Sequence, residues 1–165
     1  MKRGVVFTVL GILLFLFWGF SGNVIEFLKE NPMGESRTEA RTEDFLLSLE
    51  TKKETYESGE PIDIWTTVKY EGRKPYQKIY HGGSIFYLAI HGVDHEFEQV
   101  FGMRQPLLST TLYRNVTKIQ TFEALQELKL PPGNYRIEAL SDFSKTDDTG
   151  NNIQIPLELI IKIFN

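Results

Sequence analysis

The sequence contains no cysteine among its 165 residues. This absence excludes a disulfide framework, a thiol nucleophile, a cysteine-ligated zinc site and the cysteine that would carry an N-terminal lipid. A surplus of positive charge is also missing, since 18 basic residues face 22 acidic ones. Proteins that bind nucleic acid gain much of their affinity by neutralising phosphates, so this balance argues against that class.

Sequence signatures of catalysis are missing as well. The chain has no Gly-x-Ser-x-Gly, no His-Glu-x-x-His and no glycine loop of the phosphate-binding kind. We therefore expect a non-catalytic protein without a cofactor. The composition, 41% hydrophobic and 13% aromatic, is that of a globular chain, and the length leaves room for one domain beside a short N-terminal segment.

The N-terminus carries a long apolar run. Lys2 and Arg3 precede residues 4–20, in which Thr8 is the only conventionally polar side chain. Continued to residue 25, the run has 22 residues, and as a helix it would be about 33 Å long, enough to cross a bilayer. The basic pair favours a cytoplasmic N-terminus, with the rest of the chain on the outer side of the cell membrane.

Residues 1–25 are therefore predicted to be a signal anchor that inserts in the membrane through residues 4–25. The small residues Gly19 and Ser21 also suit a signal peptidase, which leaves a cleaved signal peptide and a secreted product open. Both alternatives export the remainder of the chain. Residues 26–44 are polar and charged, which predicts a linker, and residues 45–165 form the predicted domain.

The domain shows the period of two that is typical of β-strands. Between residues 62 and 70, and again between 153 and 163, apolar and polar side chains alternate. Pro156 interrupts the last run, so that strand is expected at a sheet edge or with a bulge there. Predicted strands cover residues 45–49, 62–70, 76–81, 84–90, 96–101, 107–113, 119–125, 135–140 and 153–163. Many short strands without a long helical pattern predict an all-β, two-sheet sandwich.

Two segments carry a resemblance to bacterial immunoglobulin-like extracellular domains. ETYESGEPIDIWTTVKYEGRKP (residues 54–75) resembles their opening strands, and LKLPPGNYRIEA (residues 128–139) resembles their closing corner. Within that superfamily the arrangement is most similar to the bacterial intracellular proteinase inhibitor domain. The resemblance implies an immunoglobulin-like antiparallel β-sandwich in which the hydroxyl of Tyr135 bonds to a nearby backbone group.

The resemblance is incomplete where that family has an Asp-Phe followed by a Gly-x-x-Trp hairpin. Here the chain has SIFYLAIHGVDHEF (residues 84–97), which lacks the tryptophan. No inhibitory residue can be transferred to this sequence, and proteinase inhibition stays an alternative, with residues 102–106 as the loop that would resist cleavage.

A partner-binding surface is predicted from aromatic and apolar residues on nominally outward positions. Trp and Tyr are enriched where proteins meet, and apolar side chains on an outer strand face mark a site for association. The predicted surface comprises Trp65, Tyr76, Tyr80, Tyr87, Ile160 and Phe164. For Trp65 the opposite register, with its ring in the core, remains open.

Two polar clusters have the residue types of metal ligands. His91 and His95, flanked by Asp94 and Glu96, lie in a predicted turn, where a spacing of four does not align two imidazoles. Residues 142–152 hold several carboxylates and amides, but not at the spacing of a calcium loop. Ordinary solvated turns explain both clusters, and a metal-dependent enzyme that uses His91 and His95 is the third alternative.

These patterns together predict a membrane-tethered or exported β-sandwich that recognises another protein of the bacterial cell envelope.

Overall fold

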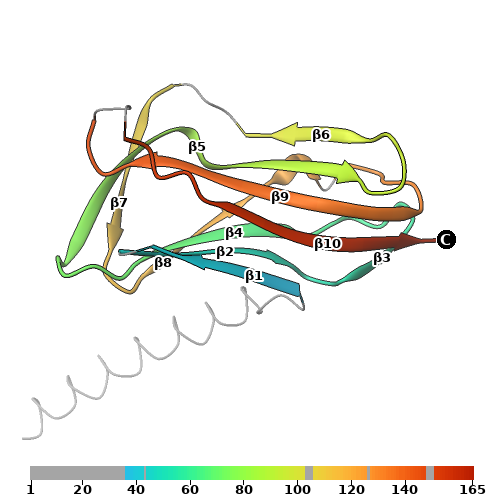
Figure 1. Ribbon diagram of the computed structural model, residues 1–165, viewed down its shortest axis with the longest axis horizontal. Coiled ribbons are helices and arrows are strands. Elements are labelled where there is room, and N and C mark those ends of the chain that lie inside the picture. Colours follow the sequence, from blue (N-terminus) through green and yellow to red (C-terminus); the bar gives the residue numbers. More distant parts are fainter. Residues whose placement is uncertain (1–35, 43, 103–105, 126, 148–150) are drawn as a thin grey trace, which may run out of the picture. The chain divides into compact units, whose positions relative to one another are not determined.

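The computed structural model describes residues 36–165 except residues 43, 103–105, 126 and 148–150. Its described strands form two sheets packed face to face (Figure 1), so the predicted all-β, two-sheet architecture is confirmed. The first sheet has the order β1 (Ser36–Arg41), β2 (Phe45–Thr51), β4 (Ile64–Tyr70), β8 (Thr117–Thr121). The second has the order β3 (Thr55–Glu57), β10 (Pro156–Phe164), β9 (Gly133–Ser144), β5 (Tyr76–Gly92), β6 (Glu98–Phe101), and β7 (Leu108–Tyr113) also pairs with β5.

The signal anchor or signal peptide predicted for residues 1–25 lies outside the described residues. Within the described part of the chain, no helix has the length and apolar content that crossing a bilayer requires. The helical segment described there is a single 3-10 turn, η1 (Glu123–Leu125).

The core lies between the sheets and is built by the predicted alternation. Along β10 every odd-numbered side chain from Leu157 to Ile163 is buried and every even-numbered one is exposed. Aromatic rings connect the two layers. Phe45 of β2 lies edge-on to Phe143 of β9, with centroids 5.1 Å apart, and Tyr70 of β4 also packs against Phe45, with centroids 5.5 Å apart.

The predicted strands 76–81 and 84–90 are one strand, β5, that continues through a bulge. His81 and Phe86 are both buried although they are an odd number of positions apart, and the pairing with β9 shifts register between them. Gly82 and Gly83 lie in this irregular stretch, where a small residue permits the bend. The bulge divides β5 into an N-terminal half that pairs with β7 and a C-terminal half that pairs with β6.

Strand β1 corrects the predicted linker, because residues 36–41 of the segment 26–44 pair with β2 along their whole length. The prediction rested on the scarcity of apolar side chains, but a strand at a sheet edge gains its order from backbone hydrogen bonds to its neighbour. Ala40 packs against the core, while the exposed Arg37, Glu39 and Arg41 alternate with it. Charges on an outer strand also discourage pairing with other chains.

Pro156 occupies an open part of a sheet edge, as one of the two alternatives predicted. The N–H of Lys162 donates to Glu54 in the β3 region at 3.0 Å, so even-numbered residues of β10 direct their backbone groups away from β9. Strand β3 pairs only with residues 162–164. The missing N–H of Pro156 therefore falls on a side of β10 that has no strand partner among the described residues.

Tyr135 makes the predicted hydrogen bond at the start of β9. Its buried hydroxyl donates to the carbonyl oxygen of Pro131 at 2.8 Å. Because the single hydroxyl proton is used there, Nε2 of His95, 3.0 Å away, is the donor in the second contact. Burial raises the pKa of this phenol. The bonds attach the turn before β9 and the loop after β5 to the core.

Candidate recognition surface

The outer face of the second sheet combines apolar and charged side chains from neighbouring strands. The register places Tyr87 of β5 opposite Leu140 of β9, and Leu140 opposite Pro156 of β10. On the adjacent row Ala89 lies opposite Val100 of β6. Val100 is 63% exposed and Leu140 38% exposed. These five residues, which we call the apolar patch, form a continuous outward surface across four strands.

Gly102 shapes one border of the apolar patch. Its φ of +124° is one that L side chains rarely adopt, and a Cβ placed on it would lie 2.6 Å from the ring of Tyr87. A side chain at this position would therefore displace the tyrosine ring as well as strain the backbone. The glycine thus keeps the ring of Tyr87 in place against the end of β6.

An ion pair and a histidine–carboxylate contact flank the apolar patch toward the C-terminal end of β10. Nε of Arg136 lies 2.8 Å from a carboxylate oxygen of Glu138, and Nε2 of His91 lies 3.7 Å from the other oxygen. Ile160, 57% exposed, is opposite Arg136 in the register. Pairs this exposed contribute about 0–1 kcal/mol to stability. They are better suited to orienting a charged partner than to holding the sheet together.

The predicted partner-binding residues do not all share this face. Tyr87 and Ile160 lie on it, and Phe164 ends β10 opposite Glu57. Tyr76 and Tyr80 lie farther along β5 on its outward side.

Trp65, by contrast, lies on the outer face of the first sheet, between Glu50 and Thr121 of the neighbouring strands. Its neighbours Ile64 and Thr66 point into the core, so the register with the ring in the core is wrong.

Sequence reasoning missed Leu140 and Val100. A signal existed for Leu140, because it falls on the outward phase of β9, where Arg136 and Glu138 precede it. Val100 lies in a short strand whose alternation is too brief to indicate a face. The apolar patch depends on four strands being neighbours, and this pairing is not readable from any one of them.

The two histidines considered as metal ligands have separate partners. His91 faces Glu138, while His95 bonds to Tyr135. In the other cluster, Asp142 accepts hydrogen bonds from Asn152 at 2.6 Å and Gln154 at 3.3 Å. Asp147 is exposed, and Asp148 lies outside the described residues, while Asn151 and Asn152 come directly after that gap. Over the described ranges, no three His, Cys, Asp or Glu side chains converge as a metal site.

An open groove of about 840 Å³ runs between the β5 bulge, the end of β6 and strand β8. Strand β8 and the residues directly after this strand form one wall of the groove. Gln120 reaches from β8 across to β5, where its side-chain oxygen accepts from the N–H groups of Ile85 at 3.0 Å and Phe86 at 3.2 Å. Its amide nitrogen donates to the Phe86 carbonyl at 3.0 Å. This side chain therefore supplies the pairing that a further strand would otherwise give the bulge.

His81 lies in the same groove and is nearly buried. Its Nδ1 is 2.6 Å from the carbonyl oxygen of Gly82, which only accepts, so Nδ1 carries the proton. Nε2 is 2.9 Å from the Thr110 hydroxyl and accepts from it in the neutral ring. Burial lowers the pKa of His81 below its ordinary 6.5; the bond to Gly82 opposes this shift and nearby Lys118 adds to it.

We expect His81 to make the fold less stable in mild acid. The unfolded chain takes up the proton near pH 6.5, whereas the folded chain takes it up only at lower pH, so stability falls as the pH drops below about 6.5. Urea unfolding of the full chain in detergent at pH 7.5 and pH 5.5 measures this. The His81→Gln variant should lose part of the difference. An identical pH dependence in His81→Gln and the wild type would contradict the assignment.

The loop that would serve an inhibitor, residues 102–106, has its centre at residues 103–105, outside the described residues. A scan against protein-family models finds no match for this chain, and a search of curated proteins finds no similar sequence.

Proposed function

We propose that this chain is a non-catalytic, immunoglobulin-like module at the bacterial cell envelope that recognises another protein through the outer face of its second sheet. The observation that carries the proposal is the apolar patch. It crosses β10, β9, β5 and β6 on the outer side of the second sheet, where Leu140 and Val100 are exposed. An exposed apolar area bordered by ion pairs is the composition of a protein-binding surface.

The immunoglobulin-like assignment is supported by topology and by one side chain. Two sheets pack face to face, antiparallel except where β3 runs parallel to β10, and consecutive strands change sheets, as β2 and β3 do. Tyr135 occupies the start of the penultimate strand and bonds to the backbone four residues upstream, which is the tyrosine corner of this class.

Placement at the membrane rests on residues 4–25, whose length and apolar character suit a signal anchor. Cleavage after Ser21 would release the same module outside the cell. Either form presents the sandwich where partners in the envelope are accessible.

The test is capture of a partner from intact cells by crosslinking to the full chain, with mass spectrometry of the captured proteins. We expect the paired variant Val100→Glu with Leu140→Glu to reduce capture of a specific protein at least about tenfold, because each buried charge would cost more than about 1.4 kcal/mol at the centre of the interface. A matched control places the same charges at Leu107 and Val116, which are exposed to a similar degree.

Capture that is equally reduced by both pairs of substitutions would argue against the apolar patch as the binding surface. Recovery of no specific protein from cells that display the folded chain would argue against the recognition function itself.

A further inference from the structure

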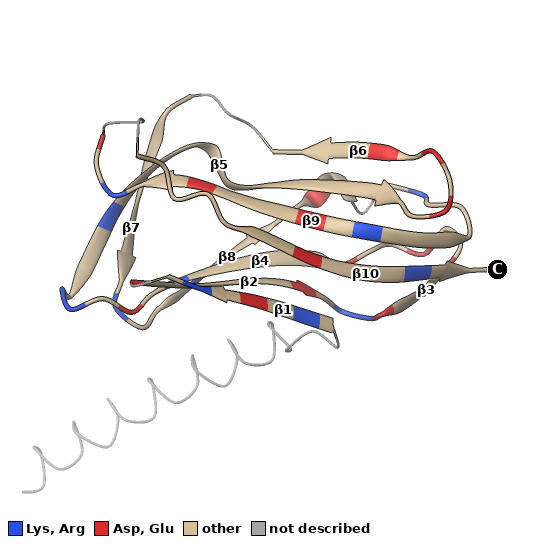
Figure 2. Cartoon of the chain, in the orientation of Figure 1, with Lys and Arg blue, Asp and Glu red and all other residues tan. Residues whose placement is uncertain are grey.

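Positive charge is segregated within this acidic chain. Residues 72–93 and 99–122 contain no Asp or Glu, although the whole chain carries −4. These two stretches pair with each other, since β5 lies beside β7 in the sheet. Figure 2 shows the result, with Lys and Arg gathered at the end where β4 turns into β5 and acidic residues around β6.

Four cations form a cluster there, called the basic end. Arg73 and Lys74 lie in the turn between β4 and β5, Lys78 lies on β5 opposite a β7 residue, and Arg114 comes directly after β7. The N–H of Arg114 donates to the carbonyl of Pro75 at 2.9 Å, which fixes the two turns side by side. All four side chains are exposed.

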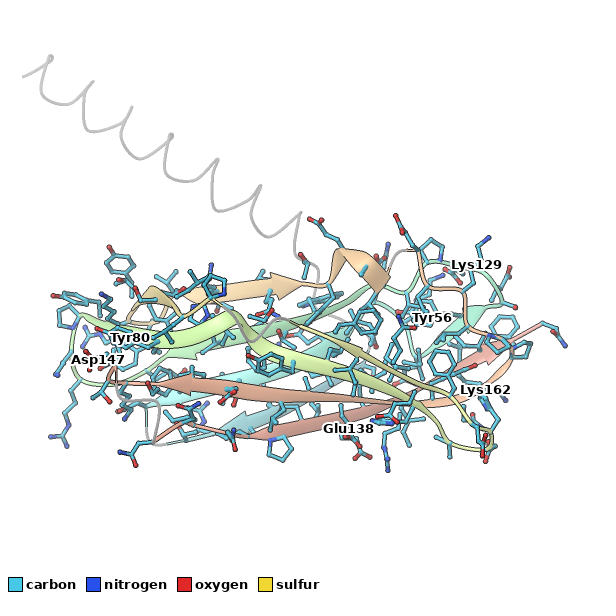
Figure 3. The ribbon with its side chains drawn as sticks, turned by 90° about the horizontal axis from the view of Figure 1, so that it is seen from above. Tyr56, Tyr80, Lys129, Glu138, Asp147 and Lys162 are labelled. Atoms are coloured by element: carbon cyan, nitrogen blue, oxygen red, sulfur yellow. The ribbon has the colours of Figure 1, made fainter. Side chains whose placement is uncertain are left out.

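These cations lack carboxylate partners among the described residues, unlike others nearby. Lys69 and Arg41 both pair with Glu71, and Lys69 above all holds the pKa of that carboxyl below its ordinary value. Lys145 pairs with Asp44. Asp147 also lies at this end, near Tyr80 (Figure 3). Among the described residues, Glu71 and Asp44 are already paired with other cations and Asp147 makes no ion pair with the basic end, so the excess positive charge stays available to an anion.

Tyrosines lie among the cations. Tyr76 and Tyr113 are opposite each other on β5 and β7, with ring centroids 6.4 Å apart, and are 54% and 60% exposed. Nζ of Lys78 lies 5.1 Å from the centroid of the Tyr80 ring. Tyrosine rings favour the interface between water and lipid, where the apolar ring and the polar hydroxyl are both accommodated.

We propose that the basic end docks on anionic phospholipid headgroups of the membrane to which the chain is tethered. The proposal rests on the tether of the proposed function. Residues 26–35 separate the apolar run from β1, and ten residues extend to at most about 35 Å, so the sandwich always stays close to the bilayer. Clusters of Lys and Arg near anionic lipid bind with about a fivefold gain for each cation.

Docking through the basic end leaves the apolar patch free to bind a partner. Tyr76 and Tyr87 lie on the same strand but eleven positions apart, which corresponds to roughly 35 Å of extended chain. Headgroups bound at the basic end would orient the sandwich and hold the apolar patch away from the bilayer. The two surfaces would therefore act together without competing.

The absence of cysteine allows a sharp test. Thr111→Cys, opposite Lys78 in the register, introduces one cysteine to which a fluorophore can be attached. The labelled full chain is inserted in nanodiscs that contain a lipid-attached quencher, and fluorescence quenching reports how close the basic end lies to the lipid surface. We expect quenching in phosphatidylglycerol discs and little in phosphatidylcholine discs. Lys74→Gln with Lys78→Gln should lower the docked-to-undocked ratio roughly twentyfold, and 0.5 M salt should act in the same direction.

The matched control is Lys129→Gln with Lys162→Gln, which removes the same charge at the opposite end (Figure 3) and should leave quenching unchanged. Equal quenching in both lipids, or equal loss in both double variants, would overturn the docking. Loss of quenching on adding inorganic phosphate, but not on adding chloride of equal ionic strength, would assign the basic end to a free anion instead. A chain that does not co-elute with the discs refutes the tether, whereas co-elution without quenching refutes docking alone.

Discussion

Replacing Phe143 by alanine is expected to lower the free energy of unfolding by about 3–5 kcal/mol. The ring is fully buried and belongs to the second sheet, whereas its neighbour Phe45, which also packs against Tyr70, belongs to the first. Removing it leaves a cavity between two layers that are each held by their own backbone hydrogen bonds, so the walls cannot collapse to fill it. Urea unfolding of the full chain in detergent, followed by pulse proteolysis, measures the loss.

Phe143→Leu tests whether packing is the cause, because it keeps most of the volume and should cost much less than the alanine variant. Phe164→Ala, at an exposed position on β10, should stay within about 0.5 kcal/mol of the wild type. A Phe143→Ala variant as stable as Phe164→Ala would contradict the packing described for the core.

Replacing Gln120 by methionine is expected to cost about 2–3 kcal/mol. Methionine has a similar shape but cannot accept from the N–H groups of Ile85 and Phe86 or donate to the Phe86 carbonyl. Among the described residues, no strand pairs with β5 between its β7 and β6 segments on the side away from β9, so these backbone groups lose their protein partners. Access of water from the groove limits the cost, since water can replace part of the lost hydrogen bonding.

The matched comparison is Thr121→Ala on the same strand, where the side chain is exposed and the expected change is within about 0.5 kcal/mol. Hydrogen exchange gives a local measurement, because the amides of Ile85 and Phe86 should exchange faster in Gln120→Met, while those of Leu47 and Leu49 should change only with global stability. Unchanged exchange at Ile85 and Phe86 would show that Gln120 does not hold the bulge.

Much of the strand content was predictable because alternation is a local signal. The apolar side chains of β2, β4, β9 and β10 that alternate in the sequence are buried, and the predicted runs overlap all four strands. The continuity of β5 was not predictable, because Gly82 and Gly83 indicate a turn as readily as a bulge. Strand pairing before and after the two glycines, together with the Gln120 side chain, keeps the chain extended through them.

The residues of the candidate surface were also predictable only in part. Tyr87 and Ile160 were predicted on outward positions, and they lie on the outer face of the second sheet. Leu140 and Val100 join them through pairings between strands that are far apart in sequence, so no window of the sequence contains the patch. Trp65, predicted in the same set, belongs to the other sheet, since membership of a sheet is decided by long-range pairing.

The amino-acid sequence by itself determined the all-β, two-sheet class of the domain and the side of β10 that enters the core, because a period of two follows from local backbone geometry. The resemblance to immunoglobulin-like domains implied a hydrogen bond from Tyr135 to a nearby backbone group, and the structure identifies the acceptor as Pro131, four residues upstream. Only the tertiary structure decided that residues 36–41 form a strand, that Gln120 completes the bulge, and that two stretches without acidic residues lie side by side. Each of these depends on which strands become neighbours, and that choice is made by the packing of the whole core.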